Sequence, residues 1–335
     1  MPEINKLVKF ILYADDANII LTGSTINEIE QQFNELAKVL VEWVSLNGLS
    51  LNVRKTNYML FSCHKTVDYD NFTPKIAGRT IEKKSTARFL GILIDDKLNW
   101  IRHVASIKAK MSRYIGVLYK LKGTLPISAR KNLYHSFVQS HINYCSLVWG
   151  LSSKNNIEMI FRTQKKAVRA TIPGFINYFF KDGITPLHTK PSFNEYNILT
   201  IHNIIAKNVM IFMNKVHNSP SLLPPSIKNL IPDNAPIPGS THETCLAWID
   251  CFRTIRLRNS LFYKGPLLFA ELIGLRETYF VFSTANTFKA SIKRYLFNLQ
   301  TNGDDDEWQY SNFKIYTIKG LRRSERKVIT RDIDG

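Results

Sequence analysis

Two adjacent carboxylates, Asp15 and Asp16, interrupt the otherwise apolar run FILYADDANIIL at residues 10–21. Acidic groups inside such a run have either a chemical role or a place in a turn. Aspartate is a common turn residue because its side chain bonds to nearby backbone N–H groups and because it tolerates unusual backbone angles. A tight turn therefore accounts for the pair without any function, and a chemical role needs support from the rest of the chain.

The basic residues of the chain are concentrated in its middle. The formal net charge is +18, and residues 66–170 carry 19 basic against 6 acidic side chains. Within that block, residues 97–157 contain ten Lys or Arg and no Asp or Glu. A local excess of one sign of charge raises the affinity for a partner of the opposite sign. The distribution therefore predicts a polyanionic partner.

The segment from residue 100 to about residue 122 has the apolar spacing of an amphipathic helix. At 100° per residue from Arg102, its apolar face falls at about 140 to 220° and comprises Val104, Ile107, Met111, Ile115 and Leu118. A basic ridge lies opposite, formed by Arg102, Lys110, Arg113 and Lys120. An ordinary solvated face normally mixes both signs of charge. The absence of acidic residues here favours contact with phosphates.

The elements that position Asp15 and Asp16 are short strands and one helix. Residues 8–13 and 18–21 predict a hairpin with the aspartates at its tip. Thr25 and Glu28 match a capping box, and the apolar spacing that follows predicts a helix that ends at Gly48. Further short strands are predicted at residues 49–53, 58–61, 75–81 and 88–95. The N-terminal third is therefore predicted to be α+β.

From Asn99 the pattern is helical to about Met213, with helices expected at residues 100–122, 129–150 and 157–171. Six of the 13 prolines follow within residues 220–238, which indicates a linker. The predicted organisation is residues 1–98, then a helical region 99–215, a Pro-rich linker 216–242, a C-terminal module 243–300 and a charged tail 301–335. No apolar run reaches the roughly 18 residues of a membrane span. The four cysteines include no C-x-x-C pair, so neither a disulfide framework nor a zinc site is expected.

The order of motifs resembles the C-terminal half of reverse transcriptases from non-LTR retrotransposons of the Jockey and CR1 type. The motifs are YADD, GLSLNVRKTNYMLF, RFLGILIDDKLNWIRHV, HINYCSLVWG and RTQKKAVRA, with TIRLRNSLFYKG and TFKASIKRYLF behind them. The resemblance covers the chain to about Leu299. It implies a partial polymerase palm, composed of the YADD hairpin, a helix and short antiparallel strands, followed by a helical thumb-like region and a small C-terminal module.

The resemblance also implies roles for the residues at the hairpin. Asp15 is the expected Mg²⁺ ligand, because in such polymerases the first Asp of this tetrapeptide shares the metal ions with an Asp from an earlier strand. Asp16 is the expected second carboxylate, which contributes negative charge or an outer-sphere contact. Tyr13 has two interpretations, direct contact with the primer and packing at the end of a strand.

Lys55 matches the family position of a general acid that protonates the leaving pyrophosphate, although an exposed loop lysine fits the same pattern. Phe89, Leu90 and Gly91 match the hairpin that holds the primer end, although a buried strand is the simpler interpretation. Gly91 suits close approach of a backbone. Asp95 and Asp96 are interpreted as acids that cap the following helix.

The implied function is RNA-directed DNA polymerisation, with Mg²⁺ as cofactor, an RNA template, a DNA primer, dNTP substrates and a nuclear location. Only 14 residues precede Asp15, and Glu3 is the single acid among them, so the chain is expected to be an N-terminally truncated fragment that is inactive alone. The alternative is a non-catalytic nucleic-acid-binding remnant that uses the basic helices of residues 97–157.

Overall fold

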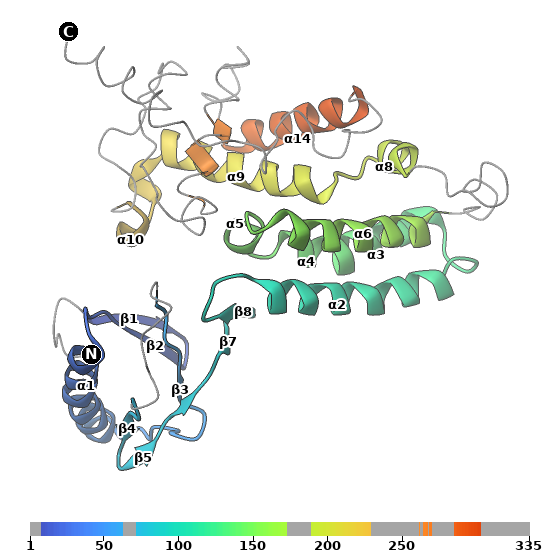
Figure 1. Ribbon diagram of the computed structural model, residues 1–335. Coiled ribbons are helices and arrows are strands. Elements are labelled where there is room, and N and C mark those ends of the chain that lie inside the picture. Colours follow the sequence, from blue (N-terminus) through green and yellow to red (C-terminus); the bar gives the residue numbers. More distant parts are fainter. Residues whose placement is uncertain are drawn as a thin grey trace, which may run out of the picture. The chain divides into compact units, whose positions relative to one another are not determined.

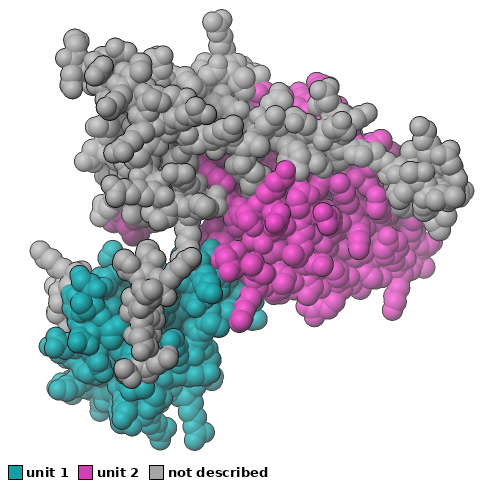
Figure 2. Space-filling model, viewed as in Figure 1, with its two compact units in different colours: residues 1–98 teal, residues 99–335 magenta. Residues whose placement is uncertain are grey.

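A computed structural model describes residues 8–62, 72–172, 189–228, 261, 264–266, 268–269 and 285–302. The chain divides into two compact units, residues 1–98 and residues 99–335 (Figure 2). Short strands and one long helix form the first unit, and helices form the described part of the second (Figure 1). The fold is therefore α+β.

The first unit begins with an antiparallel hairpin of β1 (Val8–Tyr13) and β2 (Asp16–Leu21). The hairpin leads into α1 (Ile26–Leu46), which packs against β2. The side chain of Thr25 accepts the N–H of Glu28 at 3.2 Å, while Glu28 accepts the N–H of Ser24 at 2.7 Å. These bonds satisfy free donors at the start of the helix. The predicted capping box is confirmed, with its return bond reaching Ser24 rather than Thr25.

Helix α1 ends at Leu46, with Asn47 as its C-cap, and the predicted stop at Gly48 is confirmed to within two residues. The glycine has φ +65°, a left-handed conformation that costs least without a Cβ atom. The N–H of Gly48 donates to the carbonyl of Ser45, and the N–H of Leu49 donates to the carbonyl of Val44. This is the Schellman arrangement, which satisfies the last carbonyls of a helix and reverses the chain.

Beyond the helix, the prediction of strands at residues 49–53 and 58–61 is largely wrong. The N–H groups of Lys55 and Thr56 donate to the carbonyl of Asn52, so the segment turns instead of extending. The strand that forms is β3 (Asn57–Tyr58), and it pairs in parallel with β6 (Glu82–Lys83). The expected all-antiparallel set of strands therefore contains one parallel pair.

The segments 75–81 and 88–95, each predicted as a strand, contribute to two further hairpins of the first unit. A hairpin was expected only around Phe89–Gly91, and residues 75–81 turn at Ala77-Gly78 instead of forming one strand. The first hairpin pairs β4 (Lys75–Ile76) with β5 (Arg79–Thr80), and the second pairs β7 (Thr86–Phe89) with β8 (Ile92–Asp95). Each is closed by two residues of positive φ that end in glycine, Ala77-Gly78 and Leu90-Gly91. Positive φ at both central positions matches the right-handed twist of the flanking strands.

The second unit begins with α2 (Ile101–Lys120), which packs along α6 (Lys154–Thr171). Between them the predicted helix over 129–150 is divided into α3 (Ile127–Tyr134), a π-helical segment η1 (His135–Gln139), α4 (Ser140–Asn143) and α5 (Ser146–Trp149). The remaining described elements are α8 (Lys190–Glu195), α9 (Ile201–Asn218), η2 (Pro220–Leu222), α10 (Pro225–Lys228) and α14 (Ala285–Asn302).

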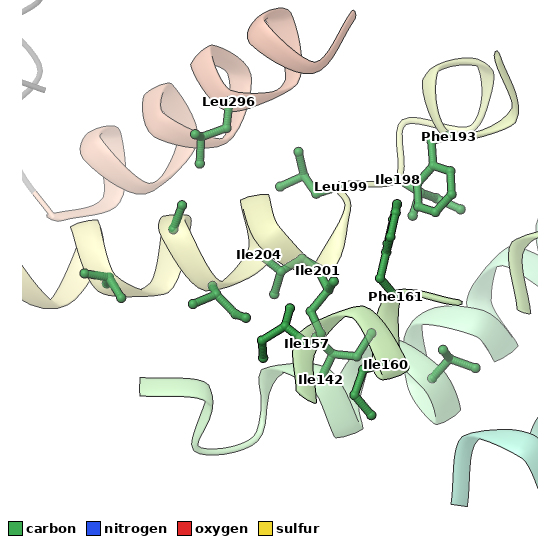
Figure 3. Packing of buried hydrophobic residues seen from close by; sticks show 14 of the residues in the cluster. Ile142, Ile157, Ile160, Phe161, Phe193, Ile198, Leu199, Ile201, Ile204 and Leu296 are labelled. Carbon is green, nitrogen blue, oxygen red and sulfur yellow. The ribbon is translucent and has the colours of Figure 1, made fainter. Parts of the chain in front are cut away.

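One hydrophobic core joins the helices of the second unit (Figure 3). The apolar face predicted for residues 100–122 is confirmed, because all five of its residues are buried. Phe161 of α6 packs near Phe193 of α8, with ring centroids 6.2 Å apart. Phe288, Ile292 and Leu296 of α14 are fully buried in the same core, so α14 packs on α9.

Several earlier expectations fall mainly outside the described residues. They concern most of the linker 216–242, most of the tail 301–335, and Cys63, Cys245 and Cys251. Cys145 is a free thiol. Among the described residues, no helix is long and apolar enough to cross a membrane.

Candidate nucleic-acid interface

The YADD sequence forms the tip of the β1–β2 hairpin. Tyr13 pairs directly with Asp16 across the two strands, which leaves Ala14 and Asp15 as the two residues of the turn. Ala14 has φ +52°, the left-handed conformation that two-residue hairpins require at the first turn position. The prediction of aspartates at a hairpin tip is confirmed, with Asp15 in the turn and Asp16 at the start of β2.

The hairpin tip is exposed on the first unit. Both carboxylates are exposed, and Tyr13 is 62% and Leu12 54% exposed. The accessible carboxylates of Asp15 and Asp16 are therefore preceded in the hairpin by two exposed apolar side chains. At 62% exposure, Tyr13 does not pack at the end of its strand among the described residues. Its contact with a primer stays a prediction.

The two aspartates suit one kind of magnesium site. Among the described residues, no group of three His, Cys, Asp or Glu side chains could hold a metal ion. Mg²⁺, however, is commonly held by one or two carboxylates together with substrate phosphates and water. Asp15 and Asp16 fit that chemistry when a phosphate-bearing ligand supplies the other oxygens.

Lys55 lies in the turn that replaces the predicted strand. Its side chain is exposed, and its backbone N–H donates to the carbonyl of Asn52 at 3.1 Å and to the side-chain oxygen of Asn52 at 3.3 Å. No ion pair joins Lys55 to either aspartate within the described part of the chain. Asn52 thus holds the backbone of Lys55 while its ammonium group stays accessible.

Phe89, Leu90 and Gly91 form the tip of the β7–β8 hairpin. Leu90 has φ +45° and Gly91 has φ +84°. A leucine with positive φ is uncommon, because its Cβ atom crowds the backbone in that conformation. The turn presents a half-buried Leu90 beside an exposed Gly91, so a ligand backbone could approach the glycine closely.

Asp95 and Asp96 do not cap α2, and the prediction that they do is wrong. The Asp95 carboxylate is buried and accepts the N–H of Lys97 at 3.1 Å, which closes a turn before the helix. The side chain of Asn99 instead accepts the N–H of Ile101, at 3.1 Å. Asn99 is three residues closer to the helix than Asp96, so its side-chain amide can reach the first free N–H of the helix.

The basic ridge of α2 is formed as the spacing predicts. Arg102, Arg113 and Lys120 are exposed, and Lys110 is partly exposed. Arg102, Arg113 and Lys120 lie opposite the buried face of the helix, and Lys110 lies between that side and the buried face. The ridge therefore presents four cations along one helix, in a stretch of sequence that contains no acidic residue.

One basic cluster was not predicted from the sequence. Lys207 lies on α9, while Lys289 and Lys293 lie on α14, which packs against it. Burial lowers the pKa of Lys207, and the positive charges of Lys293 and Lys289 lower it further. Because the helices are far apart in sequence, no spacing signal could have brought these lysines together. Besides the basic ridge of α2, the second unit therefore carries a second group of neighbouring cations, on α9 and α14.

Comparisons with known proteins find relatives that are named as retrotransposon polymerases. A Drosophila melanogaster protein named probable RNA-directed DNA polymerase from transposon BS is 24% identical over 63% of this chain and 22% of its own length. The RNA-directed DNA polymerase from mobile element jockey of the same species is 24% identical over 47% of this chain and 17% of its own length. In Nasonia vitripennis, the retrovirus-related Pol polyprotein from type-1 retrotransposable element R1 is 23% identical over 49% of this chain and 51% of its length.

These comparisons confirm the resemblance to RNA-directed DNA polymerases of non-LTR retrotransposons. The chain spans between about a sixth and a half of the length of these three relatives. No protein-family model matches the chain, and no solved structure matches it.

Proposed function

We propose that this chain is part of an RNA-directed DNA polymerase of a non-LTR retrotransposon. The observation that carries the proposal is the position of Asp15, exposed in the two-residue turn of a hairpin, in a chain similar to such polymerases. Residues 1–98 contribute part of the palm, and residues 99–215 contribute the thumb-like region.

Asp15 would hold Mg²⁺ together with the phosphates of the incoming nucleotide, and Asp16 would add negative charge beside it. A metal ion held there would supply charge neutralisation at the triphosphate and alignment of the primer hydroxyl. Lys55 is the general acid for the leaving pyrophosphate, and its exposed ammonium group suits that role because it can approach a ligand.

The remaining candidate residues bind the nucleic acid. Phe89, Leu90 and Gly91 hold the primer end at the tip of their hairpin, with Tyr13 as a further primer contact. The basic ridge of α2 binds phosphates of the RNA–DNA hybrid. Phosphate contacts fix the position of a duplex and carry no sequence information, so this binding is independent of sequence.

A second function is a non-catalytic nucleic-acid-binding protein that uses the basic helices of residues 97–157. One observation favours this function. At the YADD site, the described residues place only two carboxylates, those of Asp15 and Asp16, where they could hold a metal ion. The ridge requires no metal ion, so it can bind phosphates without catalysis.

Both functions require hybrid binding, which fluorescence anisotropy with a labelled RNA–DNA hybrid measures directly. Binding that weakens steeply with salt supports both, and a chain that binds no nucleic acid at low salt contradicts both. The genomic reading frame upstream separates them. A fused fingers segment with a further metal-binding Asp supports the polymerase, and a frame closed by a stop codon supports the binding protein.

A further inference from the structure

Three aromatic rings from three elements stack on one another in the second unit. Tyr114 of α2 and Phe137 of η1 have ring centroids 4.7 Å apart and planes 16° apart. Tyr114 and His141 of α4 have centroids 5.7 Å apart and planes 26° apart. These are stacked geometries, in the distance range at which aromatic pairs attract each other. We call this group the aromatic stack.

The aromatic stack is open to solvent. Phe137 is 41% exposed, and Tyr114 and His141 are partly exposed. Packing between α2 and η1 explains the contact of Tyr114 with Phe137, but it does not require so much of the phenylalanine ring to remain uncovered. A large ring that stays in water leaves apolar area available to a ligand.

The backbone at the aromatic stack is irregular. Phe137 is the central residue of the π-helical segment η1, between the α-helical turns of α3 and α4. Side-chain bonds hold this segment: His135 Nδ1 and Gln139 Oε1 lie 2.6 Å apart, and the Ser140 hydroxyl donates to the carbonyl of Ser136. Single π-helical turns inside α-helices occur frequently at functional sites.

Positive charge lies beside the rings. Lys110 precedes Tyr114 by one helical turn on α2, and Arg113 is its direct neighbour. Burial lowers the pKa of His141, and the charges of Lys110 and Arg113 lower it further. The aromatic stack therefore adjoins the basic ridge.

We propose that the aromatic stack binds the first unpaired base beyond a duplex. The base stacks on the exposed ring of Phe137, while Lys110 and Arg113, the ridge residues nearest the stack, contact phosphates where the duplex passes into the single strand. Planar rings beside cations match the two parts of a nucleotide, its base and its phosphate. Binding tolerates any base, because every base has a flat face. The proposal rests on the proposed function and deepens it, since the ridge binds duplex phosphates whereas the aromatic stack binds a single strand that continues from the duplex.

The test compares two probes by fluorescence anisotropy, a blunt RNA–DNA hybrid and the same hybrid with a short single-stranded overhang. Stacking of one base on an aromatic ring raises affinity by roughly tenfold. The unaltered chain should therefore bind the overhang probe about tenfold more tightly than the blunt probe. Phe137→Leu should remove this difference and leave the affinity for the blunt probe unchanged, because leucine keeps apolar packing but offers no flat ring.

Two further variants separate stacking from a fold defect. Phe137→Trp restores a ring and should restore the preference for the overhang. Tyr119→Leu is the matched control, because Tyr119 is 49% exposed on the opposite flank of α2, and it should keep the preference. Circular dichroism checks that each variant is folded.

Equal binding of the two probes by the unaltered chain overturns the proposal, and so does a Phe137→Leu variant that keeps the full preference. In either case the aromatic stack only packs α2 against η1. A chain that binds neither probe at low salt contradicts the proposed function itself, so the two failures are distinct.

Discussion

The side-chain oxygen of Gln300 in α14 accepts the backbone N–H of Thr200, the N-cap residue of α9, at 3.0 Å. The same amide accepts the side-chain N–H of Asn203 at 3.1 Å and donates to the carbonyl of Ile198 at 3.0 Å. Gln300 is fully buried. It therefore satisfies polar groups at the start of α9 that have no access to water, and it fixes α14 to the core.

Gln300→Leu should lower the free energy of unfolding by about 2 to 4 kcal/mol, because it leaves several buried polar groups without a partner. Chemical denaturation followed by circular dichroism measures the change. Asn298→Leu is the matched control, since Asn298 lies on the exposed face of the same helix, and it should change stability little. Equal stability of the Gln300 variant and the unaltered chain would mean that α14 is not held through this amide.

Acid should destabilise the second unit through His103, whose buried ring lies between Trp149, with centroids 5.8 Å apart, and Trp100, at 6.4 Å. Burial, with a smaller contribution from the charge of Lys110, lowers the pKa of His103 from 6.5 to about 4. Between these values the unfolded chain binds a proton that the folded chain does not. Stability is therefore highest above pH 6.5 and falls toward pH 4, by on the order of 3 kcal/mol from this residue.

His103→Phe keeps a ring against both tryptophans and removes the titrating group. Its stability should decline less between pH 6.5 and pH 4 than that of the unaltered chain, as measured by urea denaturation at a series of pH values. Identical pH profiles for the two proteins would show that His103 is not the group responsible.

Magnesium should bind the isolated chain only weakly, because Asp15 and Asp16 supply two carboxylates and Mg²⁺ requires six oxygen ligands in near-ideal octahedral geometry. Isothermal titration calorimetry should show no micromolar binding, and Asp15→Asn should make little difference. Micromolar affinity that disappears in Asp15→Asn would contradict this, since it would require further ligands at the hairpin tip.

The sequence correctly predicted those features of the fold that depend on residues close together in the chain, such as helix ends, a helix face and a hairpin turn. The Thr25 side chain and Gly48 mark the ends of α1, because a cap and a left-handed residue act within one helical turn. The buried face of α2 follows from the 3.6-residue period alone. Asp15 could be placed at a hairpin tip because two apolar strands flank it.

The predictions failed where a single side chain or a distant segment decides the structure. Residues 49–53 alternate like a strand, yet Asn52 bonds to the backbone that follows and turns the chain. A continuous helix over residues 129–150 is interrupted at Cys145, with φ +49°, where the indole N–H of Trp149 donates to the carbonyl of Tyr144 at 2.8 Å.

The candidate site was also only partly predictable. The ridge lies on one helix, so its spacing in the sequence revealed it. The aromatic stack combines α2 with a π-helical segment, whose period differs from that of an α-helix, and periodicity could not find it. Lys207 and Lys293 come together only because α14 packs on α9.

The salt dependence of hybrid binding tests the central claim, that the basic ridge of α2 contacts phosphates. Four phosphate contacts imply a slope of log K against log salt of roughly −3.6, and changing Arg113 and Lys120 together to Gln should reduce its magnitude by roughly 1.8. The fold should persist, because both side chains are exposed opposite the buried face.

Lys38→Gln with Lys75→Gln is the matched control, because it removes the same charge from exposed positions of the first unit, and it should leave the slope unchanged. The decisive measurement is filter binding of an RNA–DNA hybrid across a salt series, with circular dichroism as the folding check. The account predicts weaker binding and a shallower slope for the ridge variant alone. A folded ridge variant with unchanged affinity and slope would contradict it.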